Sequence, residues 1–119
     1  MKRLIVSFEP WDVVVVPFPF TDKQASKRRP ALVLSAKQHF DVDHSVLAMI
    51  TSRNNPCWPL DVEITDTSRT GLTAPSVIRM KLFTLDDRLI VRKAGVLHHK
   101  DIKAVSAALK QLFSAALPA

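Results

Sequence analysis

Residues 11–35 have the sequence WDVVVVPFPFTDKQASKRRPALVLS, in which two apolar segments flank a polar one. The four consecutive valines within residues 12–17 are β-branched, and such an unbroken apolar run predicts a strand that is buried on both faces. Pro17 and Pro19 lack the N–H that a ladder needs, so we expect this strand to end there. A second strand is predicted over residues 31–35. The chain therefore begins with two buried strands joined by a polar connection.

Downstream of this pair, short runs of apolar residues, alternating or continuous, predict further strands. These runs cover residues 45–51, 60–65, 76–83 and 89–96. The polar residues 37–44 are consistent with a short helix or an irregular connection. Residues 86–88, Asp-Asp-Arg, are typical of a turn or a single helical turn.

The apolar period changes over residues 101–116, where apolar side chains recur with the i, i+3, i+4 spacing of an amphipathic helix. Asp101 lies near its start, at the positive end of the helix dipole. With about five to seven short strands, this helix predicts a mainly β, α+β fold, a small and strongly bent sheet or barrel capped by a helix. We expect one domain over residues 1–119, with residues 1–10 as an N-terminal extension.

The composition fits a globular domain and excludes several other classes. With 47% hydrophobic and 24% charged residues the chain is not of the disordered type, and its single cysteine excludes a disulfide-stapled secreted scaffold. Its apolar runs are too short for a signal peptide or for a membrane span of about 20 residues. We therefore expect a cytoplasmic protein with no membrane partner. The net charge of +6 predicts an anionic partner, most commonly nucleic acid.

A basic cluster occupies the polar connection between the first two predicted strands. Most basic loops are solvated hairpins, but Arg29 stands directly before Pro30 at the mouth of a buried strand, which gives its guanidinium a stiff base. A planar guanidinium suits phosphate oxygens, so phosphate binding and plain solvation both stay open. The cluster comprises Lys23, Lys27, Arg28 and Arg29.

Other polar residues lie at strand ends and on strand faces. Thr51, Ser52 and Arg53 end one predicted strand, where such side chains either bind an anion or cap the turn. Arg79 and Lys81 share one face of another strand, because side chains two residues apart point the same way. This basic stripe either lines a groove or faces solvent.

No motif supports metal or cofactor chemistry. The side chains of the adjacent His98 and His99 diverge, the lone cysteine has no CxxC partner, and no phosphate-binding glycine loop or GxSxG occurs. We therefore expect neither a metal nor a cofactor. His39 and His44 are alternative acid–base groups, and Trp58 is interpreted as a packing residue.

Residues 11–22 and 29–35 together resemble the MazF/PemK toxin family, in which an aspartate and an apolar strand precede a polar loop and an Arg-Pro strand. The similarity extends over about residues 11–113, although Trp11 stands where many members have glycine. Further matching segments follow in order: Ile50-Thr51-Ser52, Gly71-Leu72 with Pro75-Ser76, Leu82-Phe83-Thr84-Leu85-Asp86 and the final helix.

This resemblance implies a small SH3-like β-barrel, usually a homodimer, that acts as a metal-independent, sequence-specific endoribonuclease on single-stranded RNA. Members are typically the toxin of a type II toxin–antitoxin pair, and the antitoxin blocks the RNA groove. By position, the catalytic arginine falls on Arg29 and its hydroxyl partner on Thr51, with Ser52 as the alternative. The loop over the RNA corresponds to residues 21–28. The expected RNA contacts are Lys23, Lys27, Arg28, Ser52, Arg53, Arg79 and Lys81.

The chemistry of these residues fits metal-free RNA cleavage. When a 2′-hydroxyl attacks the adjacent phosphate, negative charge builds on the phosphoryl oxygens, and each well-placed donor there is commonly worth a few kcal/mol. Arg29 offers N–H donors and Thr51 a hydroxyl. Two other functions stay open, a catalytically inactive barrel that binds RNA or a partner and a DNA gyrase inhibitor like CcdB. The basic cluster favours the nuclease, because poisoning a protein does not need it.

Overall fold

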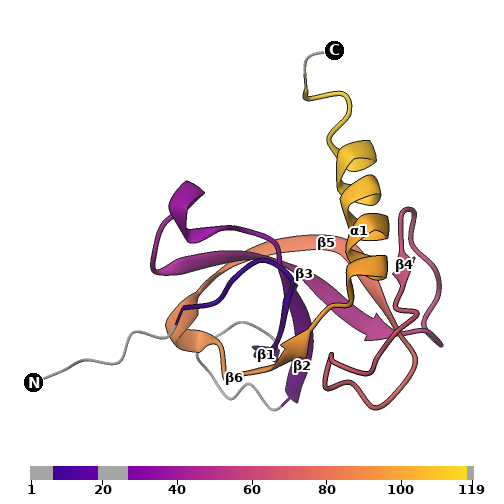
Figure 1. The fold of residues 1–119 in the computed structure, drawn as a ribbon, viewed down its shortest axis with the longest axis horizontal. Coiled ribbons are helices and arrows are strands. Elements are labelled where there is room, and N and C mark those ends of the chain that lie inside the picture. Colours follow the sequence, from indigo (N-terminus) through magenta and orange to yellow (C-terminus); the bar gives the residue numbers. More distant parts are fainter. Residues whose placement is uncertain (1–6, 19–26, 118–119) are drawn as a thin grey trace, which may run out of the picture.

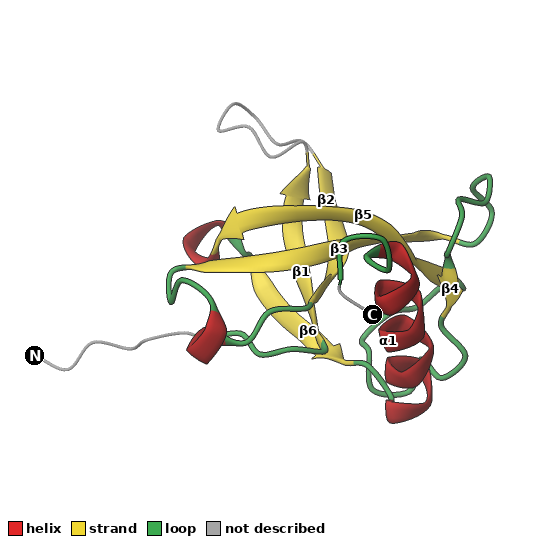
Figure 2. Ribbon diagram, turned by 90° about the horizontal axis from the view of Figure 1, so that it is seen from above, coloured by secondary structure: helices red, strands yellow, loops and turns green. Residues whose placement is uncertain are grey.

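Six antiparallel strands form one curled sheet, with a single long helix against one side (Figures 1 and 2). The computed structural model describes residues 7–18 and 27–117. Within this part of the chain the strand order is β4-β5-β3-β2-β1-β6. The predicted mainly β fold with a C-terminal helix is confirmed. The strands are β1 Asp12–Phe18, β2 Lys27–Val33, β3 His44–Ser52, β4 Val62–Glu63, β5 Ser76–Asp86 and β6 Arg92–Val96.

The valines of β1 are buried on both faces of the sheet, as predicted. Val13 belongs to a core cluster that includes Val105 of the helix, whereas Val14 and Val16 belong to a second cluster with Leu47 of β3. All of these side chains have no exposed surface. Valines at neighbouring positions of the strand supply both clusters at once, while Val15 is half-buried.

β2 starts earlier than predicted and is polar at its beginning. Exposure falls along the strand, from exposed Lys27 and Arg28 through half-buried Arg29 to fully buried residues 31–33. The ladder with β1 covers residues 27–32, and β1 continues through Pro17, which pairs with Arg28. Placing Lys27, Arg28 and Arg29 in a loop is therefore wrong. The hairpin projects beyond the core, where charged side chains on a paired strand stay hydrated.

Local capping and backbone geometry set the ends of the later elements. Of the two possibilities left open ahead of β3, a short helix is present as η1, Lys37–His39, and a second helical turn, η2, spans Asp87–Leu89. The Asp86 carboxylate accepts a hydrogen bond from the Arg88 N–H over 2.8 Å and fixes this turn, so β6 starts three residues later than predicted. β4 starts two residues later than predicted because Leu60 has a φ of 66°, a left-handed conformation that interrupts an extended run, and it ends two residues earlier, at Glu63.

The helix α1 spans His99–Leu112. It starts two residues before the predicted helix and ends four residues before it. His98 caps it, since its Nδ1 accepts the Lys100 N–H over 3.1 Å. Asp101 lies in the first turn, as expected, and its buried carboxylate accepts hydrogen bonds from both the N–H and the hydroxyl of Thr65. The last turns of α1 extend away from the sheet (Figure 1). Over residues 7–18 and 27–117, no helix has the length and apolarity that crossing a membrane requires.

Candidate active site

β2 and β3 stop pairing at the point where their polar residues begin. Their ladder runs as far as the pair Ala31 and Met49. Continuing the same register by two residues places Arg29 opposite Thr51. Residues opposite each other in an antiparallel pair point to the same face and lie within side-chain reach. Pro30, which has no N–H to donate to a neighbouring strand, stands where the ladder ends.

Two hollows meet at this divergence of the strands. Their volumes are about 470 and 190 Å³, and three residues, Arg29, Ile50 and Thr51, line both. Strand alternation places Arg29 and Thr51 on the sheet face of Val16, whereas Ile50 points to the opposite face, where the larger hollow lies. The Arg29–Thr51 pair therefore stands between the two hollows.

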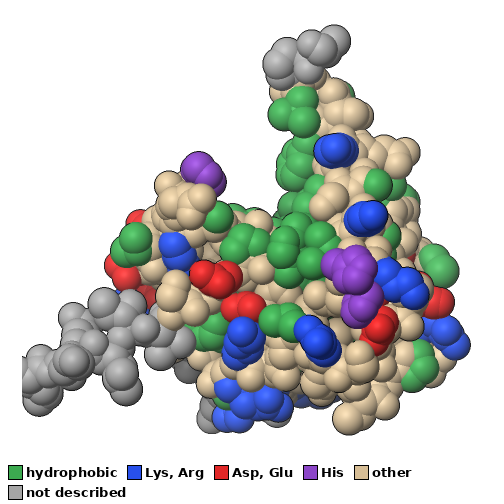
Figure 3. All heavy atoms as spheres, viewed as in Figure 1, with side chains coloured by type: hydrophobic (Ala, Val, Ile, Leu, Met, Phe, Trp, Pro, Cys, Tyr) green, Lys and Arg blue, Asp and Glu red, His purple; other side chains and the backbone are tan. Residues whose placement is uncertain are grey.

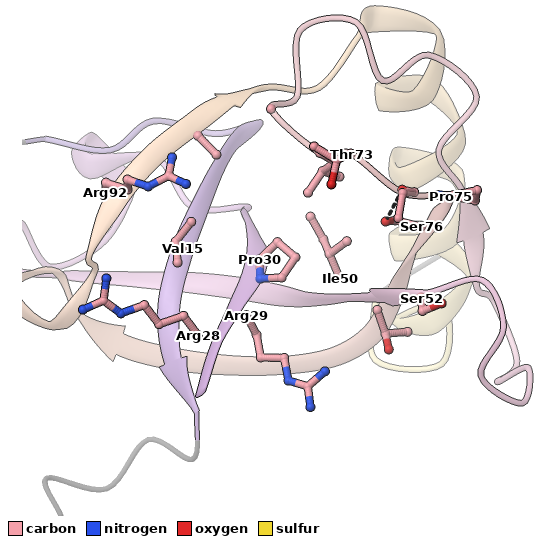
Figure 4. Close-up of a pocket in the computed structure, with 15 residues that line it drawn as sticks. Val15, Arg28, Arg29, Pro30, Ile50, Ser52, Thr73, Pro75, Ser76 and Arg92 are labelled. Carbon is pink, nitrogen blue, oxygen red and sulfur yellow. Dashed lines mark hydrogen bonds between the residues drawn. The ribbon is translucent and has the colours of Figure 1, made fainter. Parts of the chain in front are cut away.

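The larger hollow has an apolar floor and polar ends (Figure 4). The floor comes from Val15 and Ile50, with Pro30 between them. Cationic side chains of β2 and β6 lie at one end, and hydroxyl side chains lie at the other. An apolar surface with a few polar groups around it is typical of a ligand-binding cleft. The polar residues are Arg28 and Arg92 at the first end and Ser52, Thr73 and Ser76 at the second.

Two glycines hold the far wall of the larger hollow in place. Gly71 has a φ of 76°, which favours glycine, and a Cβ there would collide with the carbonyl oxygen of Ala94. A Cβ on Gly95 would collide with the carbonyl oxygen of Arg69. The loop around the fully buried Thr70 therefore lies directly on β6, and the wall depends on both glycines.

Arg29 presents its guanidinium between the hollows. The side chain is half-buried, and its Cζ lies 5.5 Å from the centre of the Phe18 ring, a cation–π contact that limits its rotamers. Within the described residues, no carboxylate or carbonyl accepts a hydrogen bond from it. Its N–H donors are therefore available to a ligand with anionic oxygens.

The Thr51 hydroxyl is oriented by a residue that sequence reasoning missed. Asn55 donates a hydrogen bond from Nδ2 to Thr51 Oγ1 over 2.6 Å. An oxygen that accepts this bond directs its own proton elsewhere, so Thr51 is arranged as a donor. Asn55 also lines the smaller hollow. In the sequence Asn55 is one polar residue of a turn, four residues after Thr51. Only the fold shows that its side chain reaches the Thr51 hydroxyl.

The remaining cations differ in what they contact. Arg28 lines the larger hollow and Lys27 is exposed beside it on β2, while Lys23 lies outside the described residues. Ser52 lines the larger hollow. Arg53 lines neither hollow and pairs through Nη1 with Glu63 over 3.3 Å.

Arg79 and Lys81 share a face of β5, as predicted, and both line the smaller hollow. Arg79 is held tightly by Asp61, with Nε–Oδ1 and Nη2–Oδ2 distances of 3.2 and 2.9 Å. Partial burial raises the pKa of Asp61, but hydrogen bonds from Arg79 and from the Trp58 N–H outweigh it, and the pKa is lowered overall. Arg79 therefore anchors the neighbouring turn, and Lys81 is the exposed cation of the stripe.

A family profile of PemK-like, MazF-like toxins of type II toxin–antitoxin systems matches residues 9–113. The chain belongs to this family. Its fold is similar to that of MazF in a MazE-MazF complex from Deinococcus radiodurans, with a TM-score of 0.70 and 22% identity over 92% of this chain and 97% of that one. It is also similar to the Mycobacterium tuberculosis toxin MazF-mt6, with a TM-score of 0.66 and 21% identity over 87% and 96% of the two chains.

A third similar structure is an endoribonuclease in complex with its cognate antitoxin from a mycobacterial species, with a TM-score of 0.69 and 15% identity over 97% and 99% of the two chains. At these identities the likeness is one of fold. A comparison with curated proteins gives no match.

In this MazF-like chain, histidines lie away from the Arg29–Thr51 pair. His44 starts β3, seven residues before Thr51, or about 23 Å along an extended strand. His39 lies in η1, and His98 caps α1. No histidine lines either hollow, and no cluster of metal-ligating side chains occurs among residues 7–18 and 27–117. The geometry therefore does not support His39 or His44 as the base.

Proposed function

We propose that this protein is a metal-independent, sequence-specific endoribonuclease that cleaves single-stranded RNA as the toxin of a type II toxin–antitoxin pair. The observation that carries the proposal is the placement of Arg29 and Thr51 across the gap between β2 and β3, at the junction of two hollows. Membership of the MazF-like family supports the reaction class. Both residues were expected from the sequence resemblance, and the fold brings them together.

In the proposed reaction the 2′-oxygen of one nucleotide attacks the phosphorus of the next phosphodiester. The O2′–P bond forms, the P–O5′ bond breaks, and the 5′-oxygen leaves as a hydroxyl with a proton taken from solvent water. Negative charge builds on the non-bridging oxygens, where Arg29 supplies paired N–H donors and Thr51 a hydroxyl. Asn55 holds Thr51 in the donating orientation.

Arg29 acts as a cation in this mechanism and not as the general base. The pKa of an arginine is above about 12, so a neutral guanidinium is expensive to form at neutral pH. With no histidine lining the hollows, the 2′-hydroxyl proton passes to solvent water. Rate enhancement then comes from charge stabilisation and from alignment of the strand.

Charged and apolar parts of the surface support the proposed RNA and protein partners. Lys27 and Arg28 at the exposed start of β2, with Arg92 across the larger hollow, form a cationic path for the phosphate backbone. The chain charge of +6 suits an antitoxin with an acidic segment.

We also propose a homodimer. Apolar side chains lie along α1 toward its free end (Figure 3), and Phe113 and Leu117 are exposed there, which supports a protein contact.

The test is incubation of the purified protein with mixed-sequence RNA in EDTA, followed by mapping of the cut ends. We expect cuts at a defined sequence, loss of cutting in Arg29→Ala, and a smaller loss in Thr51→Ala. Arg88→Ala is the matched control, because this exposed arginine lines neither hollow and is not among the expected RNA contacts. A strict requirement for an added divalent ion would contradict the mechanism. RNA binding without any cutting would favour the inactive-binder alternative.

A further inference from the structure

Trp58 is a large aromatic residue that the fold holds rigidly at the surface. Its side chain is 45% exposed, in a turn whose residues 54–59 are all exposed. The ring nevertheless has defined neighbours, with the Cζ of Arg79 at 5.0 Å and the Nζ of Lys81 at 5.9 Å from its centre. The sequence-based interpretation of Trp58 as a packing residue is therefore incomplete. The ring packs on two cations, and much of its surface faces solvent.

The backbone beside this ring is fixed by an ion pair that is itself shielded from water. Asp61 accepts the Trp58 N–H over 2.9 Å and holds Arg79 with two further hydrogen bonds. Arg79 in turn donates to the carbonyl oxygen of Pro56 over 2.7 Å. The side chains of Asp61 and Arg79 are each only 11% exposed. One guanidinium thus ties the turn on both sides of Trp58 and supports its ring.

This arrangement is costly for a residue with only a structural role. Shielding an ion pair carries a desolvation penalty, and an exposed indole contributes less to the core than a buried one. The arrangement restricts the ring before any ligand arrives. A preorganised aromatic surface loses little conformational entropy when a flat ligand stacks on it.

The ring also lies beside the candidate active site. Arg79 and Lys81 line the smaller hollow together with Arg29 and Thr51. Arg79 pairs with Met49 of β3, two residues from Thr51, which corresponds to about 7 Å along the strand. The cations that carry the indole therefore belong to the hollow that receives the reacting strand in the proposed function.

We propose that the exposed surface of Trp58 stacks on a nucleobase of the single-stranded RNA, at a nucleotide flanking the cleaved bond. The inference rests on the proposed function and adds a subsite for a nucleobase to the candidate active site. Stacking suits single-stranded RNA because an unpaired base presents its whole flat face, and every base has one. Arg79 and Lys81 keep the ring in place, and Lys81 is also available to the phosphate of the stacked nucleotide.

The test uses the full chain with Arg29→Ala to prevent cleavage, and a set of RNA oligonucleotides that each carry one abasic position. With Trp58 present, we expect one abasic position beside the cleavage site to weaken binding about tenfold, the scale of one base–aromatic stack. Trp58→Ala should weaken binding of intact RNA to a similar extent. It should also abolish the penalty at that position, because the base then has nothing to stack on.

Two variants serve as controls. Trp58→Phe keeps an aromatic face and should retain most of the affinity. Phe40→Ala removes another exposed aromatic side chain, 39% exposed, that lines neither hollow, and should bind RNA like its parent. Thermal unfolding of each variant checks that the fold is intact.

The inference is overturned if Trp58→Ala binds intact RNA as its parent does, or if the abasic penalty persists without Trp58. It is also overturned if Trp58→Ala changes the oligomeric state while RNA affinity stays the same, because the ring would then belong to a contact between copies of the chain. Cleavage by the unmodified protein reports separately on the proposed function. If the protein shows the abasic penalty but never cleaves RNA, the stacking role of Trp58 is supported and the catalytic role of Arg29 and Thr51 is refuted.

Discussion

Replacing Asn55 with alanine removes one hydrogen bond from the candidate active site, the one that its Nδ2 donates to Thr51 Oγ1 over 2.6 Å. The side chain is exposed, so its loss leaves no cavity. What changes is the direction of the Thr51 hydroxyl. Without Asn55 the hydroxyl rotates among its staggered positions, and only some of them point its proton at the phosphoryl oxygen. In the proposed mechanism Asn55 is therefore a positioning residue, and its effect requires Thr51.

The size of the effect follows from the bond that is lost. A neutral hydrogen bond contributes a net of about 0.5–1.5 kcal/mol, which corresponds to a decrease in kcat of about two- to twelvefold. KM should change little, because the donor acts mainly on charge that develops in the transition state. Asn55→Asp should be worse. A carboxylate cannot donate to Oγ1, accepts a hydrogen bond from the Thr51 hydroxyl instead, and repels the phosphate.

The assay is a double-mutant cycle on cleavage of one RNA oligonucleotide in EDTA. We expect Asn55→Ala to lower the single-turnover rate of cleavage by this factor, and to have no further effect in a Thr51→Ala background. Asn54→Ala is the matched control, because that neighbouring exposed side chain does not bond to Thr51. Full activity of Asn55→Ala, or equal losses with and without Thr51, would refute the positioning role.

Three further outcomes can be measured. Gly71→Ala should distort the wall of the larger hollow and lower both the melting temperature and RNA affinity, because a Cβ there meets the Ala94 backbone; unchanged values would contradict the close contact. Replacing the cluster cations other than Arg29 by alanine should flatten the slope of log K against log salt by about 0.7 per lost phosphate contact, or roughly 2 units for the three, in a titration of RNA affinity. Because the pKa of Asp61 is lowered, its contribution to stability is complete above its unfolded pKa of about 3.9 and is lost as the pH falls through the lower folded value. Asp61→Asn should therefore weaken the acid dependence of unfolding below about pH 4 and leave it unchanged between pH 5 and 8.

The buried half of the fold could be predicted from the sequence, because burial leaves a local signature. Val13, Val14 and Val16 predict a strand with two apolar faces, and the change in the spacing of apolar residues predicts α1. The polar half could not be predicted in the same way. Lys27 and Arg28 carry no strand signal of their own, and they extend β2 only because β1 continues opposite them.

The backbone conformation of Trp11 could not be predicted from the sequence either. This residue has a φ of 76°, the left-handed region that favours glycine, so a tryptophan takes the conformation expected for the glycine of many family members. Its N–H donates to the carbonyl oxygen of Val33 over 2.7 Å, its carbonyl oxygen accepts from Leu97 N–H over 2.9 Å, and its ring packs against the first core cluster. Tertiary contacts of this kind outweigh the local cost of the conformation, and no local pattern in the sequence reports them.

The pairing of β2 explains how a buried core and a cationic candidate site can lie next to each other on one strand. The last three residues of β2 are fully buried and paired with β3, and Ala31 and Leu32 also pair with β1. Arg29, in contrast, keeps β1 as its partner but is past the end of the β3 ladder. The buried end fixes the position of the backbone, and the early end of the β3 ladder leaves room for two hollows. A guanidinium in a fully paired sheet would need a carboxylate to offset its burial, and that carboxylate would compete with phosphate. Ending one ladder while keeping the other gives Arg29 a rigid base and leaves its donors available to an anionic ligand.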